Sequence, residues 1–385
     1  MDEIRRRDFM KFAAGALLLP ASFARNSFFQ DRPMESHPAW QNYKRAIVVD
    51  ALGGPGSEVP GDDGTAPLSP QMIADIKNSG VTVVNWTVGV VGNVPNAFEE
   101  TFRSIAKAER KINAHPEALI KITKPEHISA AKSSGRLGVV YGFQDASMLG
   151  TDLSRADVFY DFGVRVIQLT YNVRNLVGDG CLEPADAGLS KFGYLVVEKL
   201  NSLGVLIDLS HCGQHTTADA IKSSNRPVAV THSGCRALAD LPRNKRDEEL
   251  RALADKGGFF GIYLMPSFLS ISGQVTSDDV IRHLEHAINI CGEDHIGIGT
   301  DGYISATNVT PAYQKHFREE IATRRRLGIS APGERDTVYK FVSDLNTPRR
   351  FEIIANLLLA RGHKESRIEK ILGGNFVRIA REAWQ

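Results

Sequence analysis

Residues 205–211 read VLIDLSH and residues 227–233 read PVAVTHS, and these two stretches decide the fold. Each is a mainly aliphatic run followed by a hydroxyl residue and a histidine. Near-continuous apolar runs are typical of strands that are buried on both faces, as the strands of parallel sheets are. The two stretches therefore predict parallel strands that carry a histidine, His211 or His232, at the carboxyl end.

Strands of the same kind alternate with helical segments along most of the chain. Six more apolar runs occupy residues 46–50, 81–87, 137–143, 164–170, 259–264 and 296–300. Helical patterns lie between the strands at residues 70–78, 97–114, 125–133, 191–202, 216–224, 247–256 and 277–291. Eight strands with intervening helices predict an α/β fold, namely a TIM-type (β/α)8 barrel. A doubly wound open sheet is the alternative, but no glycine-rich dinucleotide-binding motif supports it.

The residues after the eighth strand follow a different pattern. Residues 305–346 are polar and irregular, which predicts a long loop with one helix over the mouth of the barrel. Within this segment, the run Arg324-Arg325-Arg326 is interpreted as a solvated cluster of charges. Residues 349–361 and 365–382 predict two amphipathic C-terminal helices.

Composition and charge fit a globular enzyme. Of the 385 residues, 42% are hydrophobic and 24% are charged, so the chain can bury a large core. The formal net charge of +1 gives no electrostatic reason to expect nucleic acid or a membrane surface as a partner. No motif implies an organic cofactor, and association into a homo-oligomer stays open.

The N-terminus has the layout of an export signal. Arg6 and Arg7 form a twin arginine within residues 5–11, an apolar stretch follows at residues 12–19, and small residues stand at 22–24. This order resembles a twin-arginine signal, which is read by the export machinery as a partner. It predicts a periplasmic or otherwise exported protein. The chain then divides into a signal peptide (residues 1–24), an N-terminal arm (residues 25–44) and one barrel domain (residues 45–385).

Polar residues follow the predicted strands at their carboxyl ends, where TIM barrels carry their active sites. Gln144 and Tyr171 follow the third and fourth strands, His211 and His232 the fifth and sixth, and Asp301 the eighth. Two imidazoles and a carboxylate suit a divalent metal such as zinc, whose bound water can attack a carbonyl. The alternative is that both histidines are hydrogen-bonded loop residues without a metal.

These residues stand in motifs that resemble the membrane (renal) dipeptidase family. The similarity extends over nearly all of residues 45–380, and its motifs lie at residues 163–170, 188–193, 201–211, 231–233, 243–247, 257–258, 294–301 and 373–376. The resemblance implies a zinc barrel hydrolase that cleaves dipeptides, and some members accept D-residues or β-lactam-like amides.

The resemblance also implies roles for individual residues. His211 and His232 match two histidines that hold one zinc. Arg243 matches an arginine that grips the carboxylate of the substrate, for which a guanidinium fork is well shaped. Asp301 matches an acidic residue beside the metals and is the candidate catalytic proton shuttle.

The sequence departs from the family pattern in the other half of the two-metal site. Leu52 and Gly54 stand where the resemblance expects a His-x-Asp pair of ligands after the first strand. Gln144 replaces a bridging glutamate, and Tyr171 replaces a histidine that contacts the substrate's carbonyl. These changes predict at most one zinc per chain, held by the two histidines with Gln144, a weak ligand for zinc, or Asp301 as a further ligand. Tyr171 is expected to bind the substrate through its hydroxyl.

Other candidate ligands are weaker. Asp50, Asp62 and Asp63 are carboxylates near the first strand, but Asp50 is better explained as a hydrogen-bonding residue of the barrel mouth. Cys212 and Cys235 lie close to the two histidines and are expected to be buried thiols or a disulfide. In an oxidising compartment one or two disulfides are open to the four cysteines, Cys181, Cys212, Cys235 and Cys291.

Three interpretations of function follow. The first is an exported dipeptidase-like metallohydrolase, active in proteolysis, whose substrate is a small dipeptide or peptide-derived amide with a free carboxylate. The second is a non-hydrolytic enzyme that matures a peptide natural product, because exported dipeptidase-like proteins that resemble this chain are implied in finishing siderophores of the pyoverdine kind. The third is a peptide-binding protein that keeps Arg243 and the pocket but performs no chemistry.

The export signal gives a first testable prediction. Replacing Arg6 and Arg7 with lysine should leave the protein in the cytoplasm, because the twin-arginine receptor reads both guanidinium groups. Cell fractionation of the expressed full-length chain measures the outcome. An unchanged periplasmic yield would contradict this interpretation of the N-terminus.

Overall fold

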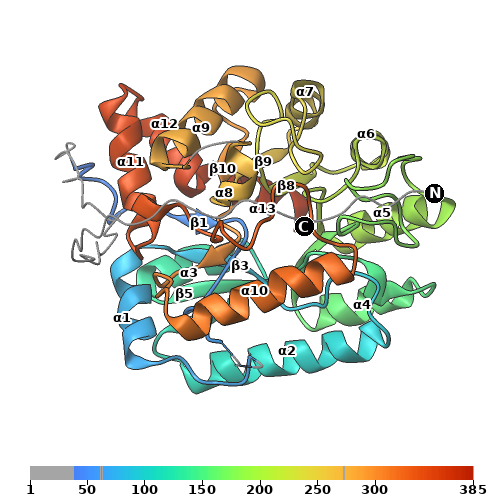
Figure 1. The fold of residues 1–385 in the computed structure, drawn as a ribbon, viewed down its shortest axis with the longest axis horizontal. Helices are drawn as coiled ribbons and strands as arrows, with labels where there is room; N and C mark the ends of the chain where they lie inside the picture. The colour runs from blue at the N-terminus through green and yellow to red at the C-terminus, as the bar shows by residue number, and fades with distance from the viewer. Residues whose placement is uncertain (1–38, 61, 63, 272–273, 385) are drawn as a thin grey trace, which may run out of the picture. The chain divides into compact units, whose positions relative to one another are not determined.

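The computed structural model describes residues 39–60, 62, 64–271 and 274–384 of the chain. The predicted signal peptide, the first part of the predicted N-terminal arm and Asp63 lie outside these residues. In the described part, parallel strands form a barrel that helices surround (Figure 1). The predicted TIM-type (β/α)8 barrel is therefore confirmed.

The barrel strands follow one another in sequence order, and all neighbours are parallel. They are β1 (Val49–Asp50), β3 (Val83–Thr87), β5 (Leu137–Phe143), β6 (Val164–Gln168), β7 (Leu206–Asp208), β8 (Ala229–Ser233), β9 (Phe259–Ile262) and β10 (Ile296–Ile298). A backbone hydrogen bond of 2.9 Å from Ala51 N to Ile298 O links the last strand to the first.

Three short strands add to this barrel. The strand β4 (Leu119–Ile122) pairs with β5 but is not one of the consecutive barrel strands. The strands β2 (Gly53–Gly54) and β11 (Gly302–Tyr303) pair with each other just beyond β1 and β10. The sequence analysis predicted none of the three.

The seven helices predicted between strands are present, with ends that differ by a few residues at most. They are α1 (Pro70–Ser79), α2 (Ala97–Ala114), α3 (Glu126–Ser134), α5 (Lys191–Leu203), α6 (Gln214–Ser223), α7 (Asp247–Asp255) and α9 (Ser277–Cys291). The predicted loop helix is α10 (Pro311–Arg326), and α11 (Arg350–Ala360) matches the first C-terminal helix. The second divides into α12 (Glu365–Glu369), a π-helical turn (Lys370–Gly374) and α13 (Asn375–Ala383). Two helices were not predicted, α4 (Ser154–Asp161) and α8 (Pro266–Leu269).

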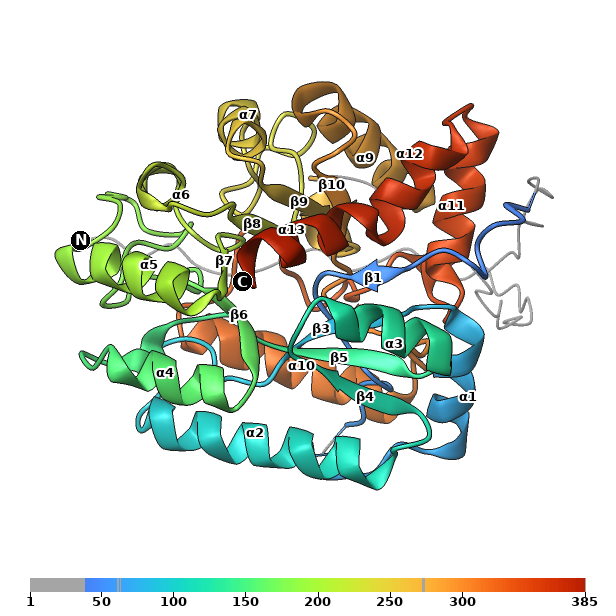
Figure 2. The same ribbon diagram turned by 180° about the vertical axis from the view of Figure 1, so that it is seen from behind.

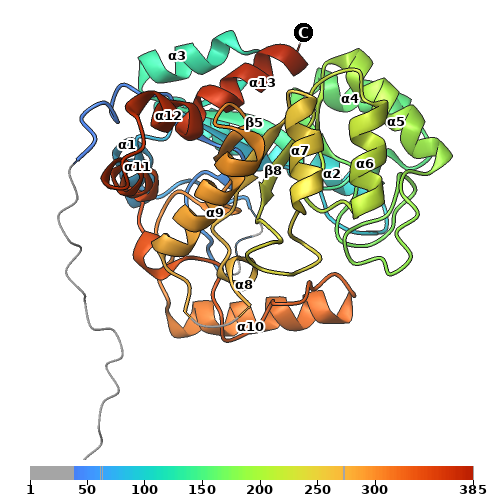
Figure 3. The same ribbon diagram turned by 90° about the horizontal axis from the view of Figure 1, so that it is seen from above.

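The two ends of the barrel are covered differently. Helix α13 covers the end at which the strands begin, where Phe376 and Trp384 pack with strand residues such as Val49 and Leu206 (Figure 2). Helix α10 lies on the opposite side from α13, near α8 and the loops that follow the strands (Figure 3). Among the described residues, no helix combines the length and the apolar character needed to cross a membrane.

Buried aspartates hold two pairs of strand ends together. Asp208, at the end of β7, accepts hydrogen bonds from the backbone N–H and the hydroxyl of Thr231 on β8, at 3.0 and 2.6 Å. Asp50, at the end of β1, binds the same two groups of Thr300 after β10, at 2.8 and 2.6 Å. The predicted hydrogen-bonding role of Asp50 is thus confirmed. We call these two contacts the aspartate–threonine clamps.

The clamp at Thr300 gives a second prediction. Replacing Thr300 with valine keeps the shape of the side chain but removes a donor from the buried Asp50, so the free energy of unfolding should fall by about 1–3 kcal/mol. Urea unfolding measures this change. The matched control is the exposed Thr151, whose replacement by valine should change the free energy by less than about 0.5 kcal/mol. A Thr300→Val chain of unaltered stability would contradict the importance of the clamp.

Candidate metal and substrate site

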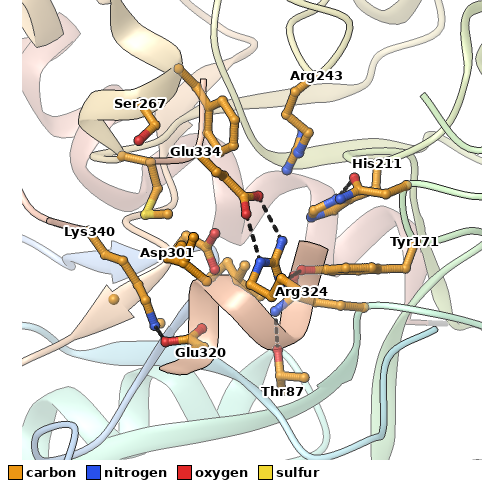
Figure 4. Close-up of a pocket in the computed structure, with 18 of the residues that line it drawn as sticks. Thr87, Tyr171, His211, Arg243, Ser267, Asp301, Glu320, Arg324, Glu334 and Lys340 are labelled. Atoms are coloured by element: carbon orange, nitrogen blue, oxygen red, sulfur yellow. Dashed lines mark hydrogen bonds and ion pairs between the residues drawn. The ribbon is translucent and has the colours of Figure 1, made fainter. Parts of the chain in front are cut away.

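A cavity of about 240 Å³ opens at the carboxyl ends of the barrel strands, beneath α10 (Figure 4). The structure brings all six predicted site residues together here. Five of them line the cavity, namely Gln144, Tyr171, His211, Arg243 and Asp301. The sixth, His232, touches His211, with the two Nε2 atoms 3.0 Å apart.

Hydrogen bonds fix the proton of His211 on its Nδ1 atom. That atom lies 2.6 Å from Oδ1 of Asn172, whose amide nitrogen donates to the carbonyl of Ile329 at 2.7 Å. Because the nitrogen is used in this way, the oxygen of Asn172 must face the imidazole and accept its proton. The Nε2 atom of His211 therefore carries a lone pair.

The same reasoning applies to His232. Its Nδ1 atom lies 2.9 Å from the hydroxyl oxygen of Thr231, whose proton is donated to Asp208 in the clamp. The hydroxyl oxygen must then accept a proton from Nδ1, which leaves a lone pair on Nε2 of His232. The clamp thus sets the tautomer of a candidate metal ligand, as carboxylates do behind many metal-bound histidines.

Two lone pairs that face each other at 3.0 Å repel unless both bind a cation. Burial and the positive charge of Arg243 lower the pKa of both imidazoles, so a proton is a poor candidate for that cation. Neutral imidazoles with oriented Nδ1–H groups are the form in which histidine binds metals. The residues present therefore fit one metal ion, held by the two Nε2 atoms.

Gln144, which was predicted as a weak further ligand, lines the cavity. Its amide nitrogen donates to the hydroxyl of Thr87 at 2.9 Å. Only the amide oxygen is left for a metal, and such oxygens are weak ligands for zinc. Its place as a metal ligand stays a prediction.

The guanidinium of Arg243 is committed largely to the backbone. Nη1 donates to the carbonyl of Ser210, and Nη2 donates to that of His232 at 2.9 Å. The side chain is 1% exposed, and its Nε is left without a partner in the described structure. Arg243 therefore ties together the two segments that carry the histidines, and two of the five N–H groups of its guanidinium are used in doing so.

Asp301 offers an unpaired carboxylate to the cavity. Its backbone has a φ of 54°, a left-handed conformation that aspartate tolerates better than most residues, and no hydrogen bond to its side chain is found among the described residues. Burial raises the pKa of this carboxyl to about 6, although the positive charges of Arg243, Lys340 and Arg324 oppose the change. The group can therefore gain and lose a proton near neutral pH, as a proton shuttle must.

The interpretation of the arginine run as solvated charges is wrong for Arg324. Its Nη1 donates to the hydroxyl of Tyr171 at 3.0 Å, while Nε and Nη2 bind the carboxylate of Glu334 at 2.8 and 2.7 Å (Figure 4). Arg325 and Arg326, by contrast, are exposed as predicted. Arg324 and Glu334 are thus site residues that the sequence analysis missed.

The helical period of α10 contains a signal that points to Arg324. Thr310 caps the helix by accepting from Tyr313 N at 3.2 Å, and the buried side chains of Tyr313, Phe317 and Ile321 form one apolar stripe. At 3.6 residues per turn, Arg324 comes about three turns after Tyr313 and lies on the same stripe. A charged residue that continues an apolar stripe is directed at the protein, whereas its neighbours face solvent.

Apolar and aromatic groups occupy the half of the mouth where the resemblance expected further ligands. Leu52 and Gly54 line the cavity beside Trp86 and Tyr303. A Cβ atom at Gly54 would lie 3.0 Å from the ring of Tyr303 and 3.5 Å from that of Trp86. Asp62, a suggested substitute ligand, instead accepts from backbone N–H groups of its own loop.

A separate acidic cluster lies near the mouth. Among the described residues, the one group of three or more potential metal ligands within 4.8 Å of one another consists of Glu58, His316 and Glu320. Lys340 pairs with Glu320 and lies 3.3 Å from Glu58. Its single ammonium already pairs with both carboxylates and occupies the space between them, so we do not assign a metal to this cluster.

The four cysteines are free thiols in the described structure, and three of them are buried. Cys212 receives a hydrogen bond from Thr170 at 3.3 Å. Burial raises the pKa of its thiol to about 11, so it stays protonated and is a poor metal ligand. Cys212 is therefore a buried thiol, which is one of the two alternatives predicted for it.

Comparison with known proteins identifies the family. The model of the membrane dipeptidases (Peptidase family M19) matches residues 67–312, well over half of the chain. The chain belongs to the membrane dipeptidase family. This family consists of metallopeptidases, which agrees with a metal at the histidine pair, whereas the number of metal ions in this member stays a prediction.

One relative of this membrane dipeptidase family member has a solved structure. The crystal structure of an amidohydrolase from Pseudomonas aeruginosa is 32% identical, with a TM-score of 0.77 over 89% of this chain and 98% of that one. An uncharacterized protein in the pqqA 5′ region of Klebsiella pneumoniae is 30% identical over 61% of this chain and 77% of its own length. An uncharacterized dipeptidase of Schizosaccharomyces pombe is 31% identical over 45% of this chain, which spans only 43% of that protein.

The geometry of the histidine pair gives a third prediction. After dialysis against zinc, elemental analysis of the protein should find one equivalent per chain, because the described residues offer one pair of oriented imidazoles. Replacing His211 with alanine should abolish this binding. The matched control is the exposed His215, whose replacement by alanine should leave it unchanged. Two tightly held equivalents, or zinc retained without His211, would contradict the assignment.

Proposed function

We propose that this chain hydrolyses a small dipeptide or peptide-derived amide with a single metal ion held by His211 and His232. The observation that carries the proposal is the pair of Nε2 lone pairs, 3.0 Å apart, at the edge of the cavity. When bound, the metal would supply a Lewis acid and a water molecule of lowered pKa.

The residues around the histidines have complementary tasks in such a reaction. Asp301, whose pKa is raised to about 6, takes a proton from the attacking water and returns it to the leaving amine. Arg243 lines the cavity, and the N–H groups that its backbone contacts leave over are available to a carboxylate of the substrate. Tyr171 lines the same cavity and can donate a hydrogen bond to the carbonyl oxygen.

The size of the cavity and the relatives support a small amide substrate. At about 240 Å³ the cavity is small for a ligand site, so it suits a molecule of the size of a dipeptide. The related Pseudomonas aeruginosa protein is described as an amidohydrolase, and the related Schizosaccharomyces pombe protein as a dipeptidase. Together with the twin-arginine motif, this supports an amide-cleaving enzyme that works in the periplasm.

One observation favours a second candidate function. Leu52, Gly54 and the rings of Trp86 and Tyr303 replace metal ligands by apolar surface, which weakens a site for hydrolysis more than a site for binding. A maturation enzyme for a peptide natural product, or a protein that only binds peptides, would retain such a pocket.

Steady-state assays on a panel of L,L- and L,D-dipeptides with added zinc test the proposed hydrolysis. Simple L,L-dipeptides should be turned over with kcat/KM below about 10⁴ M⁻¹s⁻¹, because one cation must serve where the family uses two. The rate should rise with pH around a midpoint near 6, since Asp301 acts as a base only after losing its proton.

The control for this fourth prediction is Asp301→Asn, which cannot accept a proton. It should lower kcat by about 10²–10⁴-fold and remove the rise near pH 6. Peptides that bind in calorimetry but are not cleaved at any pH would reject hydrolysis and leave the second candidate function.

A further inference from the structure

Tyr171 presents an unused hydrogen-bond donor at the cavity. Among the described residues, the one hydrogen bond of its hydroxyl is accepted from Arg324. The proton of the hydroxyl therefore has no acceptor there, although the side chain is only 7% exposed. A buried donor is costly to leave unpaired, so this proton is available to a ligand.

The ring of Tyr171 is fixed beside the histidine pair. It stacks on the imidazole of His211, with ring centroids 4.2 Å apart and an angle of 24° between the planes. His211 is one of the two residues proposed to hold the metal. The phenol thus adjoins the place where the carbonyl of a bound amide would be polarised.

Arg324 fixes the hydroxyl from the other side of the cavity. Because one edge of its guanidinium is bound by the carboxylate of Glu334, the group cannot turn, and Nη1 is directed at the phenol oxygen. Glu334 is held in turn by the hydroxyl of Ser330 at 3.1 Å. A cationic donor to the phenol oxygen polarises the O–H bond and makes it a stronger donor to a third group.

An ion pair that only attached α10 to the loop that carries Glu334 would not need a contact with Tyr171. Arg324 and Glu334 already bind each other through two hydrogen bonds, and both are largely buried, with 18% and 7% of their side chains exposed. The further contact with Tyr171 joins this pair to the wall of the cavity on β6's side, so the three residues form one connected unit (Figure 4).

We propose that Arg324, carried by helix α10, is a positioning residue that fixes Tyr171 as a hydrogen-bond donor to the oxyanion of the tetrahedral intermediate. This inference rests on the proposed hydrolysis. It assigns Arg324 and Glu334 a part in the reaction, whereas the resemblance to the family gave them none.

Tyr171 neither gains nor loses a proton when water attacks the amide. The oxygen of water bonds to the amide carbon, the carbonyl electron pair moves to the oxygen, and the proton of water passes to Asp301. The hydroxyl of Tyr171 donates a hydrogen bond to the new oxyanion. When the C–N bond breaks, the carbonyl re-forms and Asp301 returns the proton to the leaving amine.

A phosphinate analogue of a dipeptide tests the proposal by calorimetry, because it carries a tetrahedral anionic centre and is not cleaved. Tyr171→Phe and Arg324→Met should each weaken phosphinate binding by about ten- to a hundredfold, and binding of the parent dipeptide by less than about threefold. In the Tyr171→Phe background, Arg324→Met should have little further effect, since Arg324 acts through the lost hydroxyl.

The control is Arg325→Met, which removes the same charge from the same turn of α10 at an exposed position and should leave binding unchanged. If Arg324→Met prevents folding, Arg324→Lys gives the same comparison with the charge retained. Equal losses for phosphinate and dipeptide, additive losses in the double variant, or no binding of phosphinate by the unaltered chain would each overturn the inference. Binding of phosphinate without any peptide turnover would instead reject only the proposed hydrolysis.

Discussion

The aspartate–threonine clamps are the constraint on which the rest of the site depends. Each clamp binds the backbone and the side chain of a threonine at one strand end, and the next residue along the chain is His232 in one case and Asp301 in the other. A shift of register between these neighbouring strands would separate the buried carboxylates from their threonine donors, at a cost in free energy. The clamps therefore fix the positions of the polar side chains that follow these strands, His232 and Asp301.

The mouth of the barrel has two unlike halves. On the side of β7 and β8, hydrogen bonds run from Asp208 through Thr231 to His232, and Arg243 ties the two histidine segments together. On the side of β1, a clamp of the same design precedes Asp301, and Leu52, Gly54 and two aromatic rings line the cavity beside it. The same kind of clamp thus lies on both sides, while the groups beside it are polar on one side and largely apolar on the other.

Much of the fold and part of the site could be predicted from the sequence. The strand Leu137–Phe143 and the helix Ala97–Ala114 were predicted to the residue, because a long apolar run and a long amphipathic pattern leave little choice. The strand Leu119–Ile122 has four residues, too few to show a period. Arg324 was missed because neighbouring charges suggested solvent, whereas only the stripe on the folded α10 shows which of the three arginines turns inward. The proton positions on the histidines depend on contacts such as Asn172 to Ile329, 157 residues apart, which no local pattern contains.

The rings beside Gly54 leave little room for any side chain at that position. Any side chain at that position begins with a Cβ atom 3.0 Å from Tyr303, so the aspartate that the resemblance expects would fit only together with a shift or a replacement of that ring. Leu52 would have to change as well, and neither change alone gives the expected pair of ligands. A second metal site on this side of the mouth would therefore need concerted replacements at Leu52, Gly54 and Tyr303, so neither position can gain such a function on its own.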